Sequence, residues 1–263
     1  MRIISFSAIK GGVGKTTLAF NYGEWLARQG KNILFIDLDH QCKLTQTYNI
    51  FETRGTVADI FRRTGAAQII NVKPGISIIP GYMQLDVVER DLENKANKDM
   101  LLYMWFSDNY ITLSLNTFDY VIIDCHPDFA TATRNAVAVS HSIISPLTPS
   151  EHGYNAKFNI EERLEAFRDE VFDYTTRESY ITTKLYFVAN MIAHNKNSSR
   201  DLLEKLEGDS RWIASVPNKE LFNKSTLEKR PISDMKQVPD IFQAHKKFFE
   251  DIEMTFQNIS DII

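Results

Sequence analysis

Short apolar runs alternate with longer amphipathic segments along most of the chain. The runs predicted to form strands are residues 3–6, 32–36, 75–81, 118–124, 142–145, 184–190 and 212–216. The segments with helical spacing are residues 18–27, 56–61, 85–92, 100–115, 156–172 and 240–256. Strands that alternate with helices are typical of βαβ units. We therefore expect an α/β fold with a mostly parallel, twisted sheet and helices on both faces.

Turn and cap residues refine these boundaries. Gly30 is a candidate cap after the first helix, and Thr56 is a candidate N-cap of the second. Pro146 is expected to end the strand at residues 142–145, because proline lacks a backbone N–H. No internal repeat and no low-complexity linker interrupts the sequence, so residues 1–263 are predicted to form a single domain.

The composition narrows the class of protein. Hydrophobic residues make up 43% of the chain, charged residues 24%, and the formal net charge is −4. These values are ordinary for a soluble globular protein, and they exclude a global basic field that would attract nucleic acid. Cys42 and Cys125 are too few for a disulfide framework and are expected to be unreactive thiols. With no signal peptide and no apolar run of membrane-spanning length, we expect a cytoplasmic protein.

A glycine-rich stretch separates the first predicted strand from the first predicted helix. It comprises Gly11, Gly12, Val13, Gly14, Lys15, Thr16 and Thr17. Glycines let successive N–H groups approach an anion, and a helix N-terminus adds unpaired donors and a positive dipole end. Lys15 is placed to reach the β- and γ-phosphates of a nucleotide, and the Thr16 hydroxyl to bind Mg²⁺. The stretch therefore predicts a phosphate-binding loop for ATP and Mg²⁺.

The loop departs from the common G-x-x-x-x-G-K-[ST] pattern in one respect. Position 9 is Ile9 instead of glycine, and a second lysine, Lys10, stands directly before the glycines. The form K-G-G-x-G-K-T-T resembles the deviant Walker A motif of the ParA/MinD superfamily of ATPases. The resemblance implies a P-loop NTPase fold and an ATP-dependent homodimer, in which Lys10 of each subunit reaches the nucleotide of the other. Lys10 and Lys15 are thus candidate catalytic residues.

Two predicted strands are followed by acidic residues, and in a parallel sheet both would converge on the phosphate loop. Asp124 follows an apolar run and matches a Walker B aspartate, which would hold Mg²⁺ through a water. Asp37 and Asp39 lie in a segment that resembles the D-x-D-P-Q segment of ParA-type proteins. The resemblance implies that Asp37 lies near the metal ion and that Asp39 positions the attacking water.

Two histidines stand where that family usually has proline. His40 follows the second aspartate, and His126 lies in a segment that resembles D-C-P-P-S-L. We expect His40 to be a surface residue and His126 to be a tolerated loop substitution, with no acid or base role for either. Asn190 and Pro217 lie where related proteins contact adenine, so the resemblance makes both of them candidates for nucleotide binding.

Three tasks are open to an ATPase of this fold, because a fold does not fix a function. The one we favour is DNA partition, in which the ATP-bound homodimer binds DNA without sequence preference and associates with the nucleoid. A centromere-bound, ParB-like partner would then stimulate hydrolysis. The second task is that of a MinD-like ATPase cycling on a membrane, and the third is a metabolic reaction of the dethiobiotin-synthetase type.

The two ends of the sequence bear on this choice. Residues 249–263 are amphipathic but acidic, so anionic lipid would repel them and no membrane partner is expected. No winged-helix or helix-turn-helix segment precedes the phosphate loop, so the resemblance is to the short form of the family. No constellation for a small substrate stands out, and Lys10 favours a dimer over a metabolic enzyme.

DNA binding without sequence preference requires clustered cations that neutralise phosphates. The candidates are Lys196, Arg200, Lys219, Lys224, Lys229, Arg230, Lys236, Lys246 and Lys247. Acidic residues such as Glu220, Glu228 and Asp234 interleave with the late candidates. Any single lysine is therefore as consistent with a mixed-charge surface as with a DNA contact.

Overall fold

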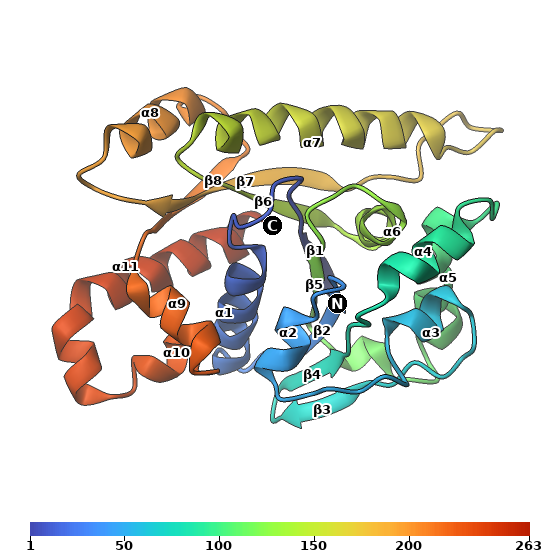
Figure 1. Cartoon of the computed structure of the whole chain (residues 1–263), viewed down its shortest axis with the longest axis horizontal. Helices are drawn as coiled ribbons and strands as arrows, with labels where there is room; N and C mark the ends of the chain where they lie inside the picture. Colours follow the sequence, from blue (N-terminus) through green and yellow to red (C-terminus); the bar gives the residue numbers. More distant parts are fainter.

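One eight-stranded sheet organises the molecule. The computed structural model describes residues 1–263 and orders the strands β3-β4-β2-β5-β1-β6-β7-β8 (Figure 1). The strands are β1 (Arg2–Phe6), β2 (Ile33–Leu38), β3 (Ile70–Lys73), β4 (Ile76–Ile79), β5 (Tyr120–Cys125), β6 (Ser142–Leu147), β7 (Lys184–Ile192) and β8 (Trp212–Pro217). All neighbouring strands are parallel except β3 and β4. The predicted mostly parallel α/β fold is confirmed.

Helices cover both faces of this sheet. They are α1 (Lys15–Arg28), α2 (Lys43–Thr47), α3 (Val57–Phe61), α4 (Leu85–Leu92), α5 (Leu101–Asn109), α6 (Thr131–Val139), α7 (Glu151–Glu170), α8 (Asn197–Leu206), α9 (Glu220–Leu227), α10 (Ile232–Met235) and α11 (Pro239–Ile262). Two short 3₁₀ turns, at Lys98–Met100 and Leu115–Thr117, flank α5. No helix combines the length and the apolar content that crossing a membrane requires.

Successive side chains of the central strands enter different cores. On β2, Ile33 and Phe35 join a cluster with α1 and α9–α11, whereas Leu34 and Ile36 join a cluster with α3–α6. A third cluster lies where β6 and β7 meet α6–α8. Because both faces are covered, these strands are continuous apolar runs and show no alternation of apolar and polar residues. This is why the sequence pattern located them.

Two predicted helix boundaries are confirmed by cap geometry. Gln29 is the C-cap of α1, and Gly30 follows it in the left-handed region with φ +80°. Thr56 caps α3: its side chain accepts from Ala58 N–H, and the Asp59 carboxylate accepts from Thr56 N–H in return. Each arrangement satisfies backbone groups that a helix end leaves unpaired.

The expectation that Pro146 ends its strand is wrong. β6 continues through Pro146 to Leu147, and Pro146 is in register with Val188 of β7. Ser7 N–H donates to the Ile144 carbonyl at 3.2 Å, so residues 144 and 146 face the side of β1. Because β1 ends at Phe6, Pro146 faces no strand that needs its missing N–H.

Other elements differ from the sequence pattern in extent. The helix expected over residues 100–115 is α5, which ends at Asn109 and is followed by turns. Strand β3 was not predicted; it pairs antiparallel at the sheet edge, where its residues are half-buried or exposed. Helix α11 is longer than expected and has a kink at His245, whose φ is −134°. The pattern of apolar residues therefore predicts the extent of an element least well where that element is short, exposed or bent.

Candidate functional site

The glycine-rich stretch forms a turn between β1 and α1, at the carboxyl edge of the sheet. Gly12 and Gly14 adopt φ values of +72° and +91°, which side chains disfavour. Strand β1 lies between β5 and β6, so the strand order reverses at this point. Open α/β sheets bind ligands at such a switch point, outside the carboxyl ends of the strands. The geometry is that of an anion-binding loop at a helix N-terminus.

A hollow of about 230 Å³ lies against the loop. Its lining includes Gly11, Gly12, Gly14, Lys15, Thr16, Thr17, Asp39, Gln41, Lys43, Pro127 and Met191. The structure thus brings together the predicted loop residues and Asp39. Val13 instead points into the protein and is buried. Gln41, Lys43, Pro127 and Met191 were not among the predicted site residues, although Gln41 is the last residue of the D-x-D-P-Q-like segment. A larger hollow of about 540 Å³, between α5, α6 and the end of α7, contains none of these residues.

Lys15 and Asp124 form the buried centre of the site. Lys15 is 6% exposed and Asp124 is 0% exposed. Burial lowers the pKa of Lys15, although the charge of Asp124 acts in the opposite direction. Burial raises the pKa of Asp124 well above its ordinary value, and the charge of Asp37 adds to this shift. Both groups therefore gain from a ligand that brings compensating charge.

Asp37 and Asp124 occupy the same register position on neighbouring strands β2 and β5. The Asp37 carboxylate accepts from Asp39 N–H at 3.1 Å and from both the N–H and the hydroxyl of Thr45. Burial raises the pKa of Asp37 to about 6. Because Asp37 already holds the start of α2, its observed contacts are structural, and its predicted place near a metal ion stays a prediction.

The residues around Asp124 fit a magnesium ion. Both carboxylate oxygens of Asp124 are buried without a hydrogen-bond partner, which is costly for a charged group. The Thr16 hydroxyl forms no hydrogen bond to either oxygen, but it lies near enough to act against the rise in the pKa of Asp124. Mg²⁺ prefers oxygen ligands and is commonly held by one or two carboxylates together with substrate phosphates. Thr16 and Asp124 supply that donor set beside the loop.

Similarity to known proteins agrees with this site. A profile of the AAA-domain family matches residues 1–173. The chromosome-partitioning protein ParA of Caulobacter vibrioides is 32% identical over 155 residues, and the sporulation initiation inhibitor protein Soj of Bacillus subtilis is 30% identical over 158 residues. The chain belongs to the ParA-type ATPase family. These two alignments cover 56% of this chain and 56% and 58% of the relatives, so the chain matches little more than half of their lengths.

Longer matches exist at lower identity. An uncharacterized protein of Methanocaldococcus jannaschii is 27% identical over 251 residues, covering 88% of this chain and 90% of that protein. A plasmid partition protein of Borrelia burgdorferi shares the fold with a TM-score of 0.70 at 22% identity, covering 94% and 98% of the two chains. An ATP complex of a McdA variant from Cyanothece has a TM-score of 0.78 at 19% identity, covering 98% and 96%.

In this ParA-type chain, Asn190 contacts the phosphate loop itself. Its side-chain amide donates to the Val13 carbonyl at 2.7 Å, and a Cβ on Gly14 would lie 2.5 Å from the same nitrogen. The register of β7 against β8 shifts between Ala189 and Ile192, and Met191 has a φ of +60°. Irregular strands of this kind often re-aim side chains near active sites. The predicted adenine contact of Asn190 stays a prediction, beside this observed structural contact.

Pro217, the other adenine candidate, ends β8 in register with Ile192. It lies one strand beyond Asn190, at the same edge of the sheet as the phosphate loop. Its adenine contact stays a prediction.

The ParA-type signature lysine, Lys10, has a partner within its own chain. Its ammonium donates to Ser150 Oγ at 3.0 Å, and Ser150 also caps α7 by accepting from Gly153 N–H. This contact holds Lys10 near the N-terminus of α7. The predicted contact of Lys10 with a second subunit stays a prediction.

Helix α1, which begins at the phosphate loop, also contacts the segment of residues 225–232. The Asn21 amide donates to Ser225 Oγ at 2.8 Å, and Asn21 Oδ1 accepts from Ile232 N–H at 2.8 Å. Asn21 is 1% exposed, so these contacts are shielded from water. Sequence pattern did not single out Asn21, because one asparagine in an amphipathic helix carries no periodic signal.

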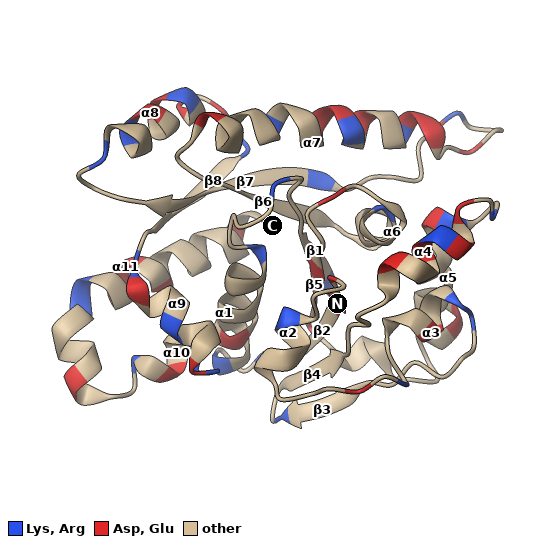
Figure 2. Ribbon diagram, in the orientation of Figure 1, with Lys and Arg blue, Asp and Glu red and all other residues tan.

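The nine DNA-binding candidates do not form one patch. Lys196 and Arg200 lie at the start of α8, on the sheet face covered by α7 and α8. The others lie on α9 and α11 or in the segments before and between α9, α10 and α11, on the opposite face. Figure 2 shows Lys and Arg interleaved with Asp and Glu over these helices. Lys236 pairs with Glu253 at 2.6 Å, and Lys246 with Glu250 at 3.8 Å. Two further contacts involve these candidates: Lys229 donates to Asn49 Oδ1, far away in the sequence, and Arg230 donates to the nearby Asp234 carbonyl.

The other five candidates are exposed and make no side-chain hydrogen bond or ion pair within the protein. Lys196 and Arg200 lie at the start of α8, and Lys219, Lys224 and Lys247 lie on α9 and α11 or directly before α9. These side chains are available to solvent anions. Their contact with DNA stays a prediction.

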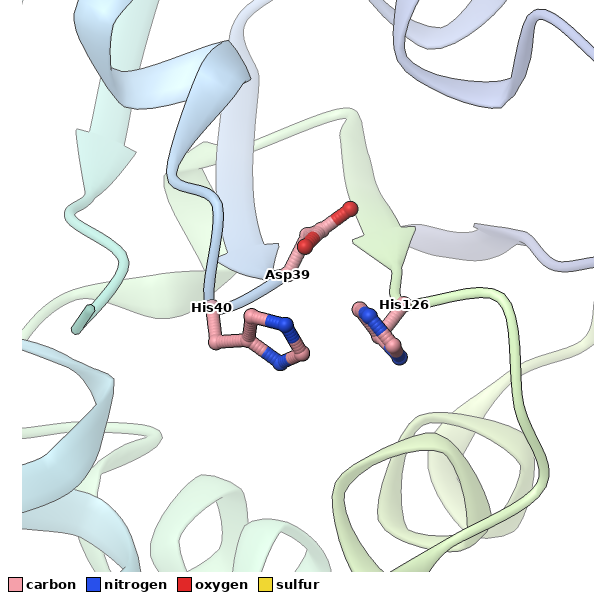
Figure 3. A group of neighbouring side chains, drawn as sticks. All are labelled: Asp39, His40 and His126. Atoms are coloured by element: carbon pink, nitrogen blue, oxygen red, sulfur yellow. The ribbon is translucent and has the colours of Figure 1, made fainter. Parts of the chain in front are cut away.

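His126 lies in the loop after β5, and His40 is more buried than the surface position expected of it. His40 is half-buried and faces His126 across the site, with ring centroids 3.9 Å apart (Figure 3).

Cys42 and Cys125 are both buried and free, and burial raises the pKa of Cys42 to about 12. A thiol with so high a pKa is a poor nucleophile, in line with the predicted lack of reactivity.

Proposed function

We propose that this protein is an ATP-dependent DNA-partition ATPase. The observation that carries the proposal is the buried Lys15–Asp124 pair at the phosphate loop, with both Asp124 oxygens free of protein partners. Support for ATP comes from similar folds: a Borrelia burgdorferi putative plasmid partition protein bound to AMPPNP, and the McdA–ATP complex. Support for partition comes from two similar proteins: the chromosome-partitioning protein ParA of Caulobacter vibrioides and the plasmid partition protein of Borrelia burgdorferi.

In the proposed mechanism, backbone N–H groups of Gly11–Thr17 bind the phosphates, and Lys15 neutralises the charge that develops on them. Thr16 and Asp124 would hold Mg²⁺, which neutralises phosphate charge when bound. Asp39, 6% exposed, orients the attacking water from the edge of the same hollow. Its Oδ1 accepts from Gln41 N–H at 2.8 Å, which leaves Oδ2 for the water.

Two protomers would sandwich two nucleotides, each Lys10 leaving Ser150 to reach the phosphates of the other subunit. The dimer would present exposed cations such as Lys219, Lys224 and Lys247 to DNA on the nucleoid. A ParB-like partner would accelerate an otherwise slow hydrolysis, and the ADP form would leave the DNA.

A gel-shift assay on random-sequence DNA at low salt tests this function. Wild type is compared with Lys15→Gln in ATP, in ADP and without nucleotide, with Lys31→Gln as an exposed control. We expect ATP to raise the DNA affinity of wild type and of the control at least tenfold and to leave Lys15→Gln unchanged. Equal affinity of wild type in ATP and ADP would contradict the proposal.

A MinD-like membrane cycle is the second candidate, because the fold is shared across the superfamily. Co-sedimentation with vesicles of anionic phospholipid separates the two. The DNA-partition proposal predicts no ATP-dependent binding to these vesicles. Sedimentation velocity of Lys10→Ala then tests the dimer: we expect nucleotide binding to persist while the ATP-dependent dimer is lost.

A further inference from the structure

The two unexpected histidines meet an aspartate at the edge of the nucleotide site. Figure 3 shows His40, which follows β2, and His126, which follows β5, turned toward one another beside Asp39. One potential ligand atom from each of the three residues lies within 4.8 Å of the other two. Asp39 is buried and both histidines are half-buried, so the group is shielded but reachable from solvent. Residues from two strands that are far apart in the sequence thus converge on one point.

The donor set differs from that of the magnesium site. Two imidazole nitrogens and one carboxylate oxygen suit Zn²⁺ and other first-row transition metals, whereas Mg²⁺ prefers oxygen ligands alone. Ligand bonds of about 2.0–2.2 Å in a tetrahedron place donor atoms roughly 3.3–3.6 Å apart. The present separations are at most 4.8 Å, so binding an ion requires the three side chains to move closer together. Three protein ligands would leave a fourth position for water.

A second carboxylate orients one of these histidines. His126 Nδ1 lies 2.9 Å from Asp128 Oδ2, which leaves Nε2 as the ring nitrogen free to bind a cation. Asp128 is itself fixed, because its Oδ1 accepts from Ala130 N–H and from the Thr133 hydroxyl, both at 3.0 Å. Metal-binding histidines almost always have such a partner on the other ring nitrogen, and it fixes both tautomer and orientation.

We propose that Asp39, His40 and His126 bind one transition-metal ion, with Zn²⁺ as the best match, and that Asp128 positions His126 for it. The same Asp39 lines the hollow at the phosphate loop. A bound ion takes up the carboxylate that the ATPase needs to orient water, so it inhibits hydrolysis. This inhibition rests on the proposed function, whereas binding of the ion does not.

The test is titration of nucleotide-free, chelator-treated protein with Zn²⁺ by calorimetry and with Co²⁺ by visible absorption. We expect one ion per chain and the strong d–d bands of tetrahedral Co²⁺. Replacing both histidines, as His40→Asn with His126→Asn, weakens binding at least 100-fold, and each single change at least tenfold. Asp128→Asn weakens it about 10- to 100-fold, as is usual for an outer-shell carboxylate. His152→Asn, an exposed change on α7, is the matched control and leaves binding unchanged.

Three results would overturn the proposal: no Co²⁺ bands in wild type, equal affinity in the double variant, or a thiolate-to-cobalt charge-transfer band. The last would assign the ion to a cysteine, either Cys42 beside His40 or Cys125 directly before His126. The wild-type spectrum needs no variant, so the proposal remains falsifiable even where the double variant fails to fold. Because no nucleotide is present, failure of the ATPase proposal would leave these measurements unaffected.

Discussion

The carboxyl edge of the sheet and the surface of α8–α11 both carry many charged residues, but in different environments. At the edge, Lys15, Asp37 and Asp124 are at most 6% exposed, and Asp124 lacks any hydrogen-bond partner. On the surface, the cations extend into solvent or make surface ion pairs, such as Lys246 with Glu250 on the same helix and Lys236 with Glu253 on another.

The difference shows which charges carry information about function. Burying an ionised group without a partner costs several kcal/mol, so such a group persists where a ligand or a special task compensates for it. Exposed ion pairs contribute about 0–1 kcal/mol and arise on most surfaces. The buried charges at the carboxyl edge of the sheet therefore indicate the class of ligand, an anion beside Lys15 and a cation beside Asp124. The exposed charges of α8–α11 indicate no particular partner.

The largest expected effect is on Asp124. Replacing it by Asn removes the only unpartnered carboxylate of the edge, so the gain in ATP affinity that Mg²⁺ confers should fall about 100-fold, which corresponds to about 2.7 kcal/mol. Fluorescent-ATP titration with and without Mg²⁺ measures this. Asp119→Asn is the control, an exposed acid just before the opposite end of the same strand. A full Mg²⁺ effect in Asp124→Asn would show that the buried carboxylate at the carboxyl edge of the sheet does not bind the metal ion.

The second effect is the pH dependence of stability. The pKa of Asp37 is raised to about 6 in the fold, from an ordinary value near 3.8. The protonated form therefore favours the fold, and its stabilising contribution is full below pH 3.8 and lost as the pH rises through about 6. The slope is greatest midway between the two pKa values, where it is about 1.2 kcal/mol per pH unit.

Urea unfolding of nucleotide-free protein between about pH 4 and about pH 7 measures this slope. Asp37→Asn should flatten it relative to wild type, and Asp251→Asn, an exposed change on α11, should not. An identical slope in wild type and Asp37→Asn would show that Asp37 is not the responsible group.

A smaller effect concerns Asn190. Alanine leaves the buried Val13 carbonyl without its donor, at a cost of about 1–1.5 kcal/mol, so nucleotide affinity should fall about tenfold. Because the observed contact of Asn190 is to the phosphate loop, the affinities for ATP and for GTP should fall by the same factor. Competition titrations compare them. A loss confined to ATP would instead assign Asn190 to adenine recognition.

The smallest effects lie on the surface of α9–α11. Lys224→Ala and Lys247→Ala should each weaken ATP-dependent DNA binding less than about threefold, because each removes one phosphate contact from many. Lys246→Ala, which breaks an exposed pair, is the matched comparison and should have no effect. A tenfold loss from one lysine would show that the surface holds a defined site after all.

The sequence predicted the parts of the fold where both faces of a strand are buried. Continuous runs at β1, β2 and β5 located the central sheet, and the glycines between β1 and α1 located the loop. Strand β3 escaped prediction because it is a half-exposed edge with no apolar run. The effect of Pro146 was mispredicted, because a proline is tolerated in β6 only where the neighbouring strand has already ended. That depends on the tertiary structure.

The same limit applies to the candidate site. Asp37 and Asp124 were predicted to converge because parallel strands share one edge, and they occupy the same register position. The contact of Asn190 with Val13 was not predictable, because it depends on an irregularity in β7. Nor was the approach of His40 to His126, since each stands alone in its own loop.

The central position of β1 has a consequence for how the chain folds during synthesis. Both neighbours of β1 come much later: Arg2 pairs with Tyr120 of β5, and Ile4 with Ser142 of β6. At typical elongation rates, about 5–20 residues per second, the ribosome needs roughly ten seconds to reach them. Throughout that interval the strand that carries the phosphate loop has no partner in the sheet. The loop therefore acquires its fixed geometry only after about half of the protein has been made.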